Sequence, residues 1–174
     1  MAARRRKGEG ADGSRAGAPG AAALAVRAVR RSDLPEIVAI DAAVTGIEKR
    51  SYWHALFRRY GVAGDALRQF LVAEDDGAVL GFVIGEVRDW EFGSPPCGWV
   101  FGIDVRPDAR QRGVGARLLA AISTGFRRAG VTKVRTMLAR DNTLILSFFR
   151  SQGMMAGPFI PLEMDLEPGR GQRR

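Results

Sequence analysis

The chain has 174 residues, 46% of them hydrophobic and 26% charged, and its formal net charge at pH 7 is +8. This length and composition are typical of one globular domain and exclude a chain that is disordered throughout. The apolar runs are only a few residues long, whereas a membrane-spanning helix needs roughly 20 residues. The sequence therefore predicts a protein without a membrane segment.

The positive charge is concentrated at the two ends of the chain. Residues 1–23 carry five basic and two acidic side chains, and residues 168–174 carry three arginines and no acid. We predict a disordered basic tail over 1–23, a folded domain over 24–167 and a basic tail over 168–174. Because the domain itself is almost neutral, we expect no basic nucleic-acid-binding face; contacts with nucleic acid would be nonspecific and made by the tails.

The sequence contains one cysteine, Cys97, and one histidine, His54. A single cysteine excludes an internal disulfide framework and favours a reducing compartment, so we expect the protein in the cytoplasm. Residues 1–23 also lack the apolar segment of a secretory signal. One histidine and one cysteine make no ligand cluster, and we therefore expect no metal.

Hydrophobic periodicity and turn residues predict the elements of the first half of the domain. A strand over 25–30 precedes a helix that begins around Ser32 and runs to about Val44. The elements that follow are a helix over 48–60 and two strands over 69–74 and 78–88, which Asp75-Asp76-Gly77 joins in a tight turn.

The second half begins with a loop over 89–98 that is rich in glycine and proline. The elements expected after it are, in chain order, a strand over 99–105, a helix over 114–129, a strand over 133–138, a helix between Asn142 and Gly153, and a strand over 159–166. This order of strands and helices predicts a single mixed α/β domain.

One segment carries a chemical signal: the strand over 99–105 leads through an Arg-rich turn to glycines that open a helix. The first N–H groups of a helix lack intrahelical partners and lie at its positive end, so they attract anions. Gly113 and Gly115 leave room for a ligand, and Arg110 and Arg112 can add charge-assisted hydrogen bonds. The segment predicts a pyrophosphate site without the fingerprint of a nucleotide P-loop or of a dinucleotide fold.

The sequence Arg110-Gln111-Arg112-Gly113-Val114-Gly115 resembles the pyrophosphate signature of the GCN5-related N-acetyltransferase (GNAT) superfamily. The strand before it, the helix after it, and the Asn142…Phe149…Gly153 helix match the order and spacing of that family. The resemblance implies a mostly antiparallel sheet flanked by helices, with acetyl-CoA as the acyl donor. The resemblance implies that acetyl-CoA is bound by Ile103, Asp104, Val105, Arg110, Gln111, Arg112, Gly113, Val114, Gly115, Ala116, Asn142 and Phe149.

The sequence departs from the family at two positions. Phe149 stands where many members have a tyrosine that protonates the departing thiolate, and residues 97–103 hold no carboxylate where members often have a glutamate base. A thiol has a pKa near 8.5, so we expect slower turnover rather than none. The candidate bases are Glu86, Glu91 and Asp104, with water or the free amine as further alternatives.

These observations predict an enzyme that transfers an acetyl group directly from acetyl-CoA to a primary amine. The acceptor is a protein N-terminus, a lysine or a small amine, and the sequence does not distinguish them. Exposed strands at the sheet edge are also compatible with a homodimer. The alternative is a noncatalytic acyl-CoA-binding module whose basic tails recruit an acidic partner.

Overall fold

The computed structural model describes residues 24–166, so both predicted tails lie outside the described residues. The chain divides into two compact units between Arg135 and Thr136. The first unit contains β1 (Ala25–Ala28), α1 (Leu34–Thr45), α2 (Arg50–Tyr60), β2 (Arg68–Asp75), β3 (Ala78–Arg88), β4 (Cys97–Val105), α3 (Val114–Arg128) and β5 (Val134–Arg135), and the second contains α4 (Thr143–Ser151). Within 24–166, no helix has the length and apolar character needed to cross a membrane.

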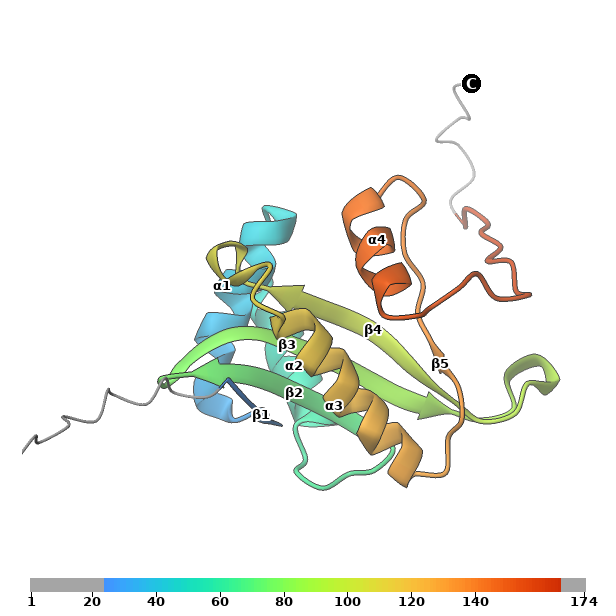
Figure 1. Cartoon of the computed structure of the whole chain (residues 1–174), viewed down its shortest axis with the longest axis horizontal. Helices are drawn as coiled ribbons and strands as arrows, with labels where there is room; N and C mark the ends of the chain where they lie inside the picture. Colours follow the sequence, from blue (N-terminus) through green and yellow to red (C-terminus); the bar gives the residue numbers. More distant parts are fainter. Residues whose placement is uncertain (1–23, 167–174) are drawn as a thin grey trace, which may run out of the picture. The chain divides into compact units, whose positions relative to one another are not determined.

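The strands form one five-stranded sheet in the order β1-β2-β3-β4-β5. The first three pairings are antiparallel, and only β4 and β5 run parallel. Helices α1 and α2 cover one face of this sheet and α3 crosses the other (Figure 1). The predicted fold class, a mixed and mostly antiparallel sheet flanked by helices, is confirmed.

The face beneath α1 and α2 holds the main aromatic core. Trp53 of α2 packs edge-on against Phe82 of β3, with ring centroids 4.8 Å apart, and also lies 6.0 Å from Phe70 of β2. Ile37 of α1 is fully buried in the same cluster. This packing fixes α1 and α2 against the middle strands and so positions every side chain that these helices present to β4.

The opposite face is kept flat by glycines so that α3 can approach it. A Cβ at Gly98 would lie 2.3 Å from the ring of Phe126, and one at Gly85 would lie 3.1 Å from both Phe126 and Ile122. The fully buried α3 side chains therefore pack almost directly on the strand backbones. This contact fixes where the N-terminus of α3 lies beyond the end of β4.

Strand β4 contains a bulge and is only partly covered by β5. Gly102 is opposite Ile84 and Val100 is opposite Gly85, so Phe101 has no partner in β3. β5 pairs with β4 only at Gly98 and Trp99. From Val100 to Val105, β4 has no strand beside it on that edge within the described part of the first unit.

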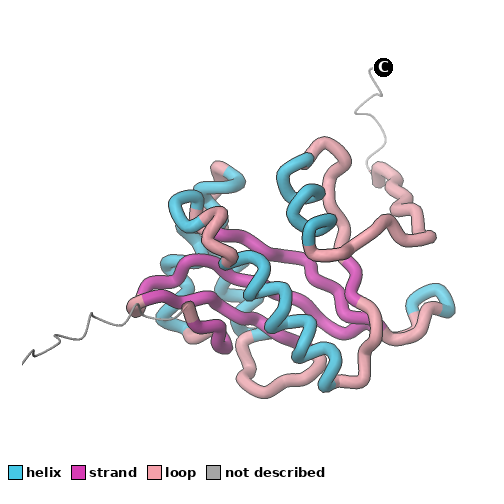
Figure 2. Tube along the Cα trace, in the orientation of Figure 1, coloured by secondary structure: helices cyan, strands magenta, loops and turns pink. Residues whose placement is uncertain are grey.

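Two sequence predictions about the last strands are wrong. The strand expected over 133–138 is reduced to Val134–Arg135, and the strand expected over 159–166 does not form; Figure 2 shows that segment as a loop. Its alternating apolar side chains are exposed, with Ile160 at 78% and Leu162 at 90%. Alternation is a local property, whereas a strand also needs a hydrogen-bonded neighbour, and Pro161 removes one donor.

Candidate active site

The N-terminus of α3 has the geometry that the anion-site prediction requires. Gly113, at the N-cap, has φ = +76°, and a Cβ there would meet nothing within 4 Å. The first helical hydrogen bond runs from the Arg117 N–H to the Gly113 carbonyl, 3.1 Å away. The N–H groups of Val114, Gly115 and Ala116 precede it, so they have no intrahelical acceptor and are available to an anion.

The two arginines of this turn differ in their surroundings. Arg112 donates from Nη2 to Oδ2 of Asp75, the last residue of β2, at 2.8 Å. The Arg110 N–H donates to the Pro107 carbonyl, whereas its guanidinium forms no hydrogen bond or ion pair within the described residues, and its charge acts on Asp104. Gln111, between them, has φ = +64°, a left-handed conformation that turns the chain sharply before the helix.

The uncovered edge of β4 leads directly to this turn. The Arg106 N–H donates to the Leu80 carbonyl of β3, at 2.8 Å. Because backbone groups alternate in direction along a strand, those of Ile103 and Val105 point to the opposite edge, where β5 has ended. An extended ligand could therefore pair with β4 as an added strand and reach the N-terminus of α3.

Asp104 lies between Ile103 and Val105 of this edge, and its side chain points to the face of the sheet that α1 and α2 cover. It is directly opposite Phe82 in β3, so its side chain shares the face on which Trp53 packs against Phe82. Burial and the charge of Asp41 raise the pKa of Asp104 to about 6, against the opposing charges of Arg110 and Lys49. A carboxylate with this pKa is ionised at neutral pH and accepts a proton more readily than an ordinary aspartate.

Asp41 and Lys49 were not predicted as site residues. Asp41 is 3% exposed; it accepts from Trp53 Nε1 at 2.9 Å and from Lys49 Nζ at 3.0 Å. In the sequence, Asp41 lies four residues after Ile37 and therefore on the buried side of α1. A carboxylate at such a position is the one sequence signal that could have indicated it.

Glu86 lies on the same face and is already paired. Its Oε2 accepts from the Tyr60 hydroxyl at 2.8 Å, and its Oε1 accepts from Arg88 Nε at 3.1 Å. Burial alone would raise the pKa of Glu86, but these two hydrogen bonds hold it below its usual value. Both oxygens are thus engaged, and the lowered pKa makes Glu86 a weaker proton acceptor than Asp104.

Glu91 lies in a short 3-10 turn, Glu91–Gly93, between β3 and β4. This turn precedes the first residue of β4, whereas Asp104 is near its last, so the two carboxylates are at opposite ends of a strand that spans Cys97–Val105. The nearest cation to Glu91 is Arg88, with Nε 4.0 Å from Oε1. The structure does not bring the three candidate bases together.

The remaining predicted donor residues belong to the second unit. Asn142 caps α4: its Oδ1 accepts from the Ile145 N–H at 3.1 Å. Phe149 lies in the same helix with its ring centroid 5.1 Å from that of Phe148. Within its own unit, Asn142 has a structural role, and position 149 supplies no hydroxyl.

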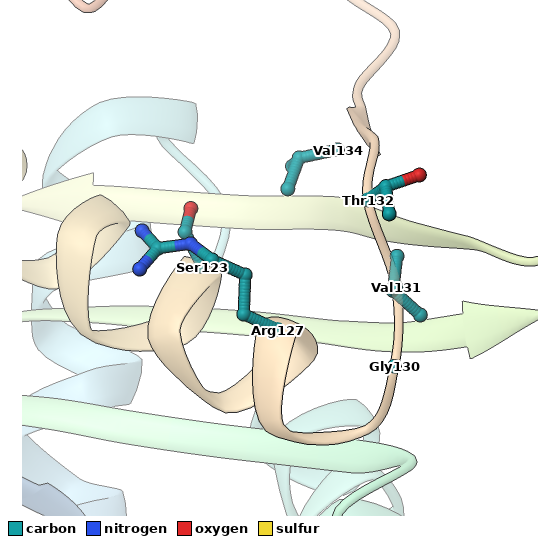
Figure 3. Close-up of a pocket in the computed structure, with 6 residues that line it drawn as sticks. All are labelled: Ser123, Arg127, Gly130, Val131, Thr132 and Val134. Carbon is teal, nitrogen blue, oxygen red and sulfur yellow. The ribbon is translucent and has the colours of Figure 1, made fainter.

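The first unit also has a surface hollow at the opposite end of α3 from Gly113. It is about 600 Å³ and lies beside the C-terminal half of α3 and β5 (Figure 3). Its lining residues are Ser123, Arg127, Gly130, Val131, Thr132 and Val134, none of them a predicted site residue. Across the described residues there is also no group of three or more His, Cys, Asp or Glu side chains that could hold a metal ion.

Comparison with known proteins finds two curated relatives, both of them named as acetyltransferases. The chain is 31% identical over 134 residues to L-2,4-diaminobutyric acid acetyltransferase of Nocardia farcinica, covering 76% of this chain and 65% of that protein. It is 27% identical over 145 residues to mycothiol acetyltransferase of Saccharomonospora viridis, covering 75% and 46%. The chain thus spans about half to two thirds of the length of these curated relatives.

The fold is similar to that of aminoglycoside N-acetyltransferase AAC(6')-Iy in complex with CoA. The TM-score is 0.74 at 20% identity, over 86% of this chain and 99% of that one. AAC(6')-Ih from Acinetobacter baumannii gives a TM-score of 0.69 at 16% identity, over 83% and 100%. Residues 34–154 match the sequence profile of the Acetyltransferase (GNAT) family. The predicted resemblance is confirmed, and the chain belongs to the GNAT acetyltransferase family.

Proposed function

We propose that this protein transfers an acetyl group from acetyl-CoA to a primary amine. One observation carries the proposal: the uncovered edge of β4 runs into the N-terminus of α3, while Asp104 presents a carboxylate on the face of the same strand. Membership of the GNAT family supports the reaction class. The reaction needs no metal, since a thioester is already activated towards an amine.

The residues present fit the donor. The N–H groups of Val114, Gly115 and Ala116, with the side chains of Arg110, Gln111 and Arg112, would hold its pyrophosphate. The open space above Gly113 admits the phosphates to these donors. The backbones of Ile103 and Val105 would pair with the pantetheine arm. A thioester carbonyl held along this edge can be polarised by a backbone N–H of β4.

We propose that Asp104 is the general base. An alkyl ammonium has a pKa near 10.4 and must lose a proton before its nitrogen can attack, which costs roughly 4–5 kcal/mol at pH 7. With a pKa of about 6, the Asp104 carboxylate is ionised at neutral pH and attracts the ammonium as well as accepting its proton. One proton of the ammonium passes to an Asp104 oxygen, and the neutral nitrogen attacks the thioester carbonyl. As the C–S bond breaks, the second proton lost by the nitrogen goes to the departing thiolate, which leaves the amide and the free thiol.

The acceptor we propose is a small molecule rather than a protein. The two curated relatives are named for small substrates, 2,4-diaminobutyric acid and mycothiol, and the two solved structures compared above are aminoglycoside acetyltransferases. A carboxylate on the acceptor side, Asp104, also suits a cationic amine.

The test is titration of acetyl-CoA by calorimetry, followed by free-thiol release with a panel of amino acids, aminosugars, diamines and N-terminal peptides. We expect binding, and thiol release that depends on a small amine. Binding without release from any amine would favour the noncatalytic module, and absence of binding would overturn the proposal. Deletion of residues 1–23 and 168–174 separates the two classes, because an enzyme keeps its turnover whereas a module recruited by its tails loses its partner.

We further propose a cytoplasmic homodimer. The single cysteine supports a reducing compartment, and the exposed apolar side chains over 159–166, among them Leu162 and Leu166, support a second copy as partner. Light scattering after size exclusion would give twice the 18.9 kDa chain mass for a dimer, and a monomer mass at micromolar concentration would contradict this.

A further inference from the structure

We infer that Asp41 is a positioning residue for catalysis: held by Lys49 and Trp53, it sets the pH at which Asp104 takes the proton from the acceptor. The inference rests on the proposed function, in which Asp104 is the base. It adds a buried side chain of α1 that touches neither substrate and acts through its charge.

Helix α1 packs against both β3 and β4, and a chain of contacts leads from Asp104 to Asp41. Asp104 is directly opposite Phe82, the Phe82 ring packs against Trp53 at 4.8 Å, and Trp53 Nε1 donates to Asp41 Oδ2 at 2.9 Å. The second oxygen of Asp41 accepts from Lys49 Nζ at 3.0 Å. Each Asp41 carboxylate oxygen thus has one donor, and the Trp53 donor is itself buried, at 4% exposure.

Packing alone does not require a carboxylate at position 41. Asp41 is 3% exposed, in a helix whose neighbouring buried side chains are Ile37, Val38 and Ile40. Burial of a charge costs several kcal/mol in water-free surroundings unless it is paired, and an apolar residue would avoid that cost. The fold instead retains the charge and supplies Trp53 and Lys49 to hold it.

The charges that act on Asp104 come from three segments and oppose one another. Asp41 of α1 disfavours its ionised form, whereas Lys49, just before α2, and Arg110, after β4, favour it. From β3 the directly opposite residue is the apolar Phe82. Asp41 and Lys49 therefore act on the pKa of Asp104 with opposite signs. Removal of the Asp41 charge should lower that pKa, and removal of the Lys49 charge should raise it.

The experiment measures the acid limb of the kcat/KM–pH profile, with acetyl-CoA and an amine that the wild-type protein accepts, in three variants. Asp41→Asn keeps an acceptor for Trp53 and removes the negative charge, so the limb should move to lower pH by about 0.5 unit or more. Lys49→Met should move it to higher pH, and Lys49→Arg should restore the wild-type position. Glu48→Gln, which removes an exposed charge beside Lys49 in the sequence, is the matched control and should leave the limb in place.

A second readout does not depend on turnover. The ¹³C carboxyl resonance of Asp104, assigned with Asp104→Asn, should titrate with the same opposite shifts in Asp41→Asn and Lys49→Met. Limbs that stay in place or move in the same direction in both variants would overturn the role of Asp41. An acid limb that persists in Asp104→Asn would instead overturn Asp104 as the base, so the two failures are distinguishable.

Discussion

The guanidinium of Arg112 and the carboxylate of Asp75 form an ion pair at 2.8 Å that joins the turn before α3 to the end of β2. The pair fixes an arginine at the anion site without burying it. Arg112→Gln should weaken acetyl-CoA binding by roughly tenfold, because a charge-assisted hydrogen bond contributes about 1.5–3 kcal/mol and water replaces part of it. Calorimetric titration measures the change. Arg128→Gln, at the other end of α3, is the matched control, and equal affinities for the two variants would disprove the phosphate role.

Replacement of the proposed base should abolish most of the activity. Asp104→Asn keeps the shape of the side chain but cannot take a proton, so kcat/KM should fall about 100-fold or more at pH 7.5. The affinity for acetyl-CoA should change little, since the proposed donor contacts are made by the uncovered edge of β4, the turn after it and the start of α3, and not by the Asp104 carboxylate. Initial rates of thiol release measure the loss of kcat/KM, and a calorimetric titration measures the affinity for acetyl-CoA. A large loss of binding with unchanged turnover at saturation would contradict the assignment.

Glu86 provides the comparison carboxylate on the same face of the sheet. It is hydrogen-bonded to Tyr60 and Arg88 and has a lowered pKa, so it is ionised throughout the range in which the acid limb is measured. Glu86→Gln should therefore leave the limb at about pH 6, although its lost contacts should lower the free energy of unfolding. A pH–rate profile in which the limb disappears would make Glu86 the base instead.

The buried charge of Asp104 should also give the protein an unusual dependence of stability on pH. Its folded-state pKa, about 6, lies above the ordinary value of 3.8. The contribution of Asp104 to stability is therefore full below the unfolded pKa and is lost as pH rises through the folded pKa. Asp104→Asn should raise the free energy of unfolding at pH 8 and raise it less at pH 4. Urea unfolding at both pH values measures this, and equal effects at both would count against a raised pKa.

The glycines beneath α3 give a stability prediction. Gly98→Ala places a Cβ 2.3 Å from the Phe126 ring, so it should lower the free energy of unfolding by about 1–3 kcal/mol or more. Phe126→Leu shortens the opposing side chain, and the double variant should lose less than the sum of the two single losses. Thermal or urea unfolding of the four proteins measures the coupling. Strict additivity would mean that the contact is not what limits the approach of α3.

Much of the fold could be predicted from the sequence because its signals are local. The tight turn at Asp75-Asp76-Gly77 and the stop at Gly130 limit the elements to within a few residues of the observed bounds. The strand expected over 159–166 does not form, although it was predicted from the same kind of local signal. Its alternation is local, but pairing depends on a neighbour that the sequence pattern does not specify.

The proposed donor site could also be predicted from the sequence, because its residues lie in one continuous segment. Strand β4, the turn and the start of α3 follow one another in the chain, so their chemistry is written in order from Ile103 to Ala116. The proposed base and the charges around it do not lie in one continuous segment. Asp104, Asp41 and Lys49 come from β4, α1 and the segment before α2, and nothing in their spacing says that they act on one another.

By itself, the sequence determined the family and the absence of a tyrosine at position 149, and it predicted an anion site at the N-terminus of α3. Only the tertiary structure distinguished the three carboxylates offered as bases. Burial and the packing of α1 against β4 raise the pKa of Asp104, whereas hydrogen bonds from Tyr60 and Arg88 lower that of Glu86. A pKa depends on the charges and solvent within a few ångströms, and those neighbours meet only when the chain has folded.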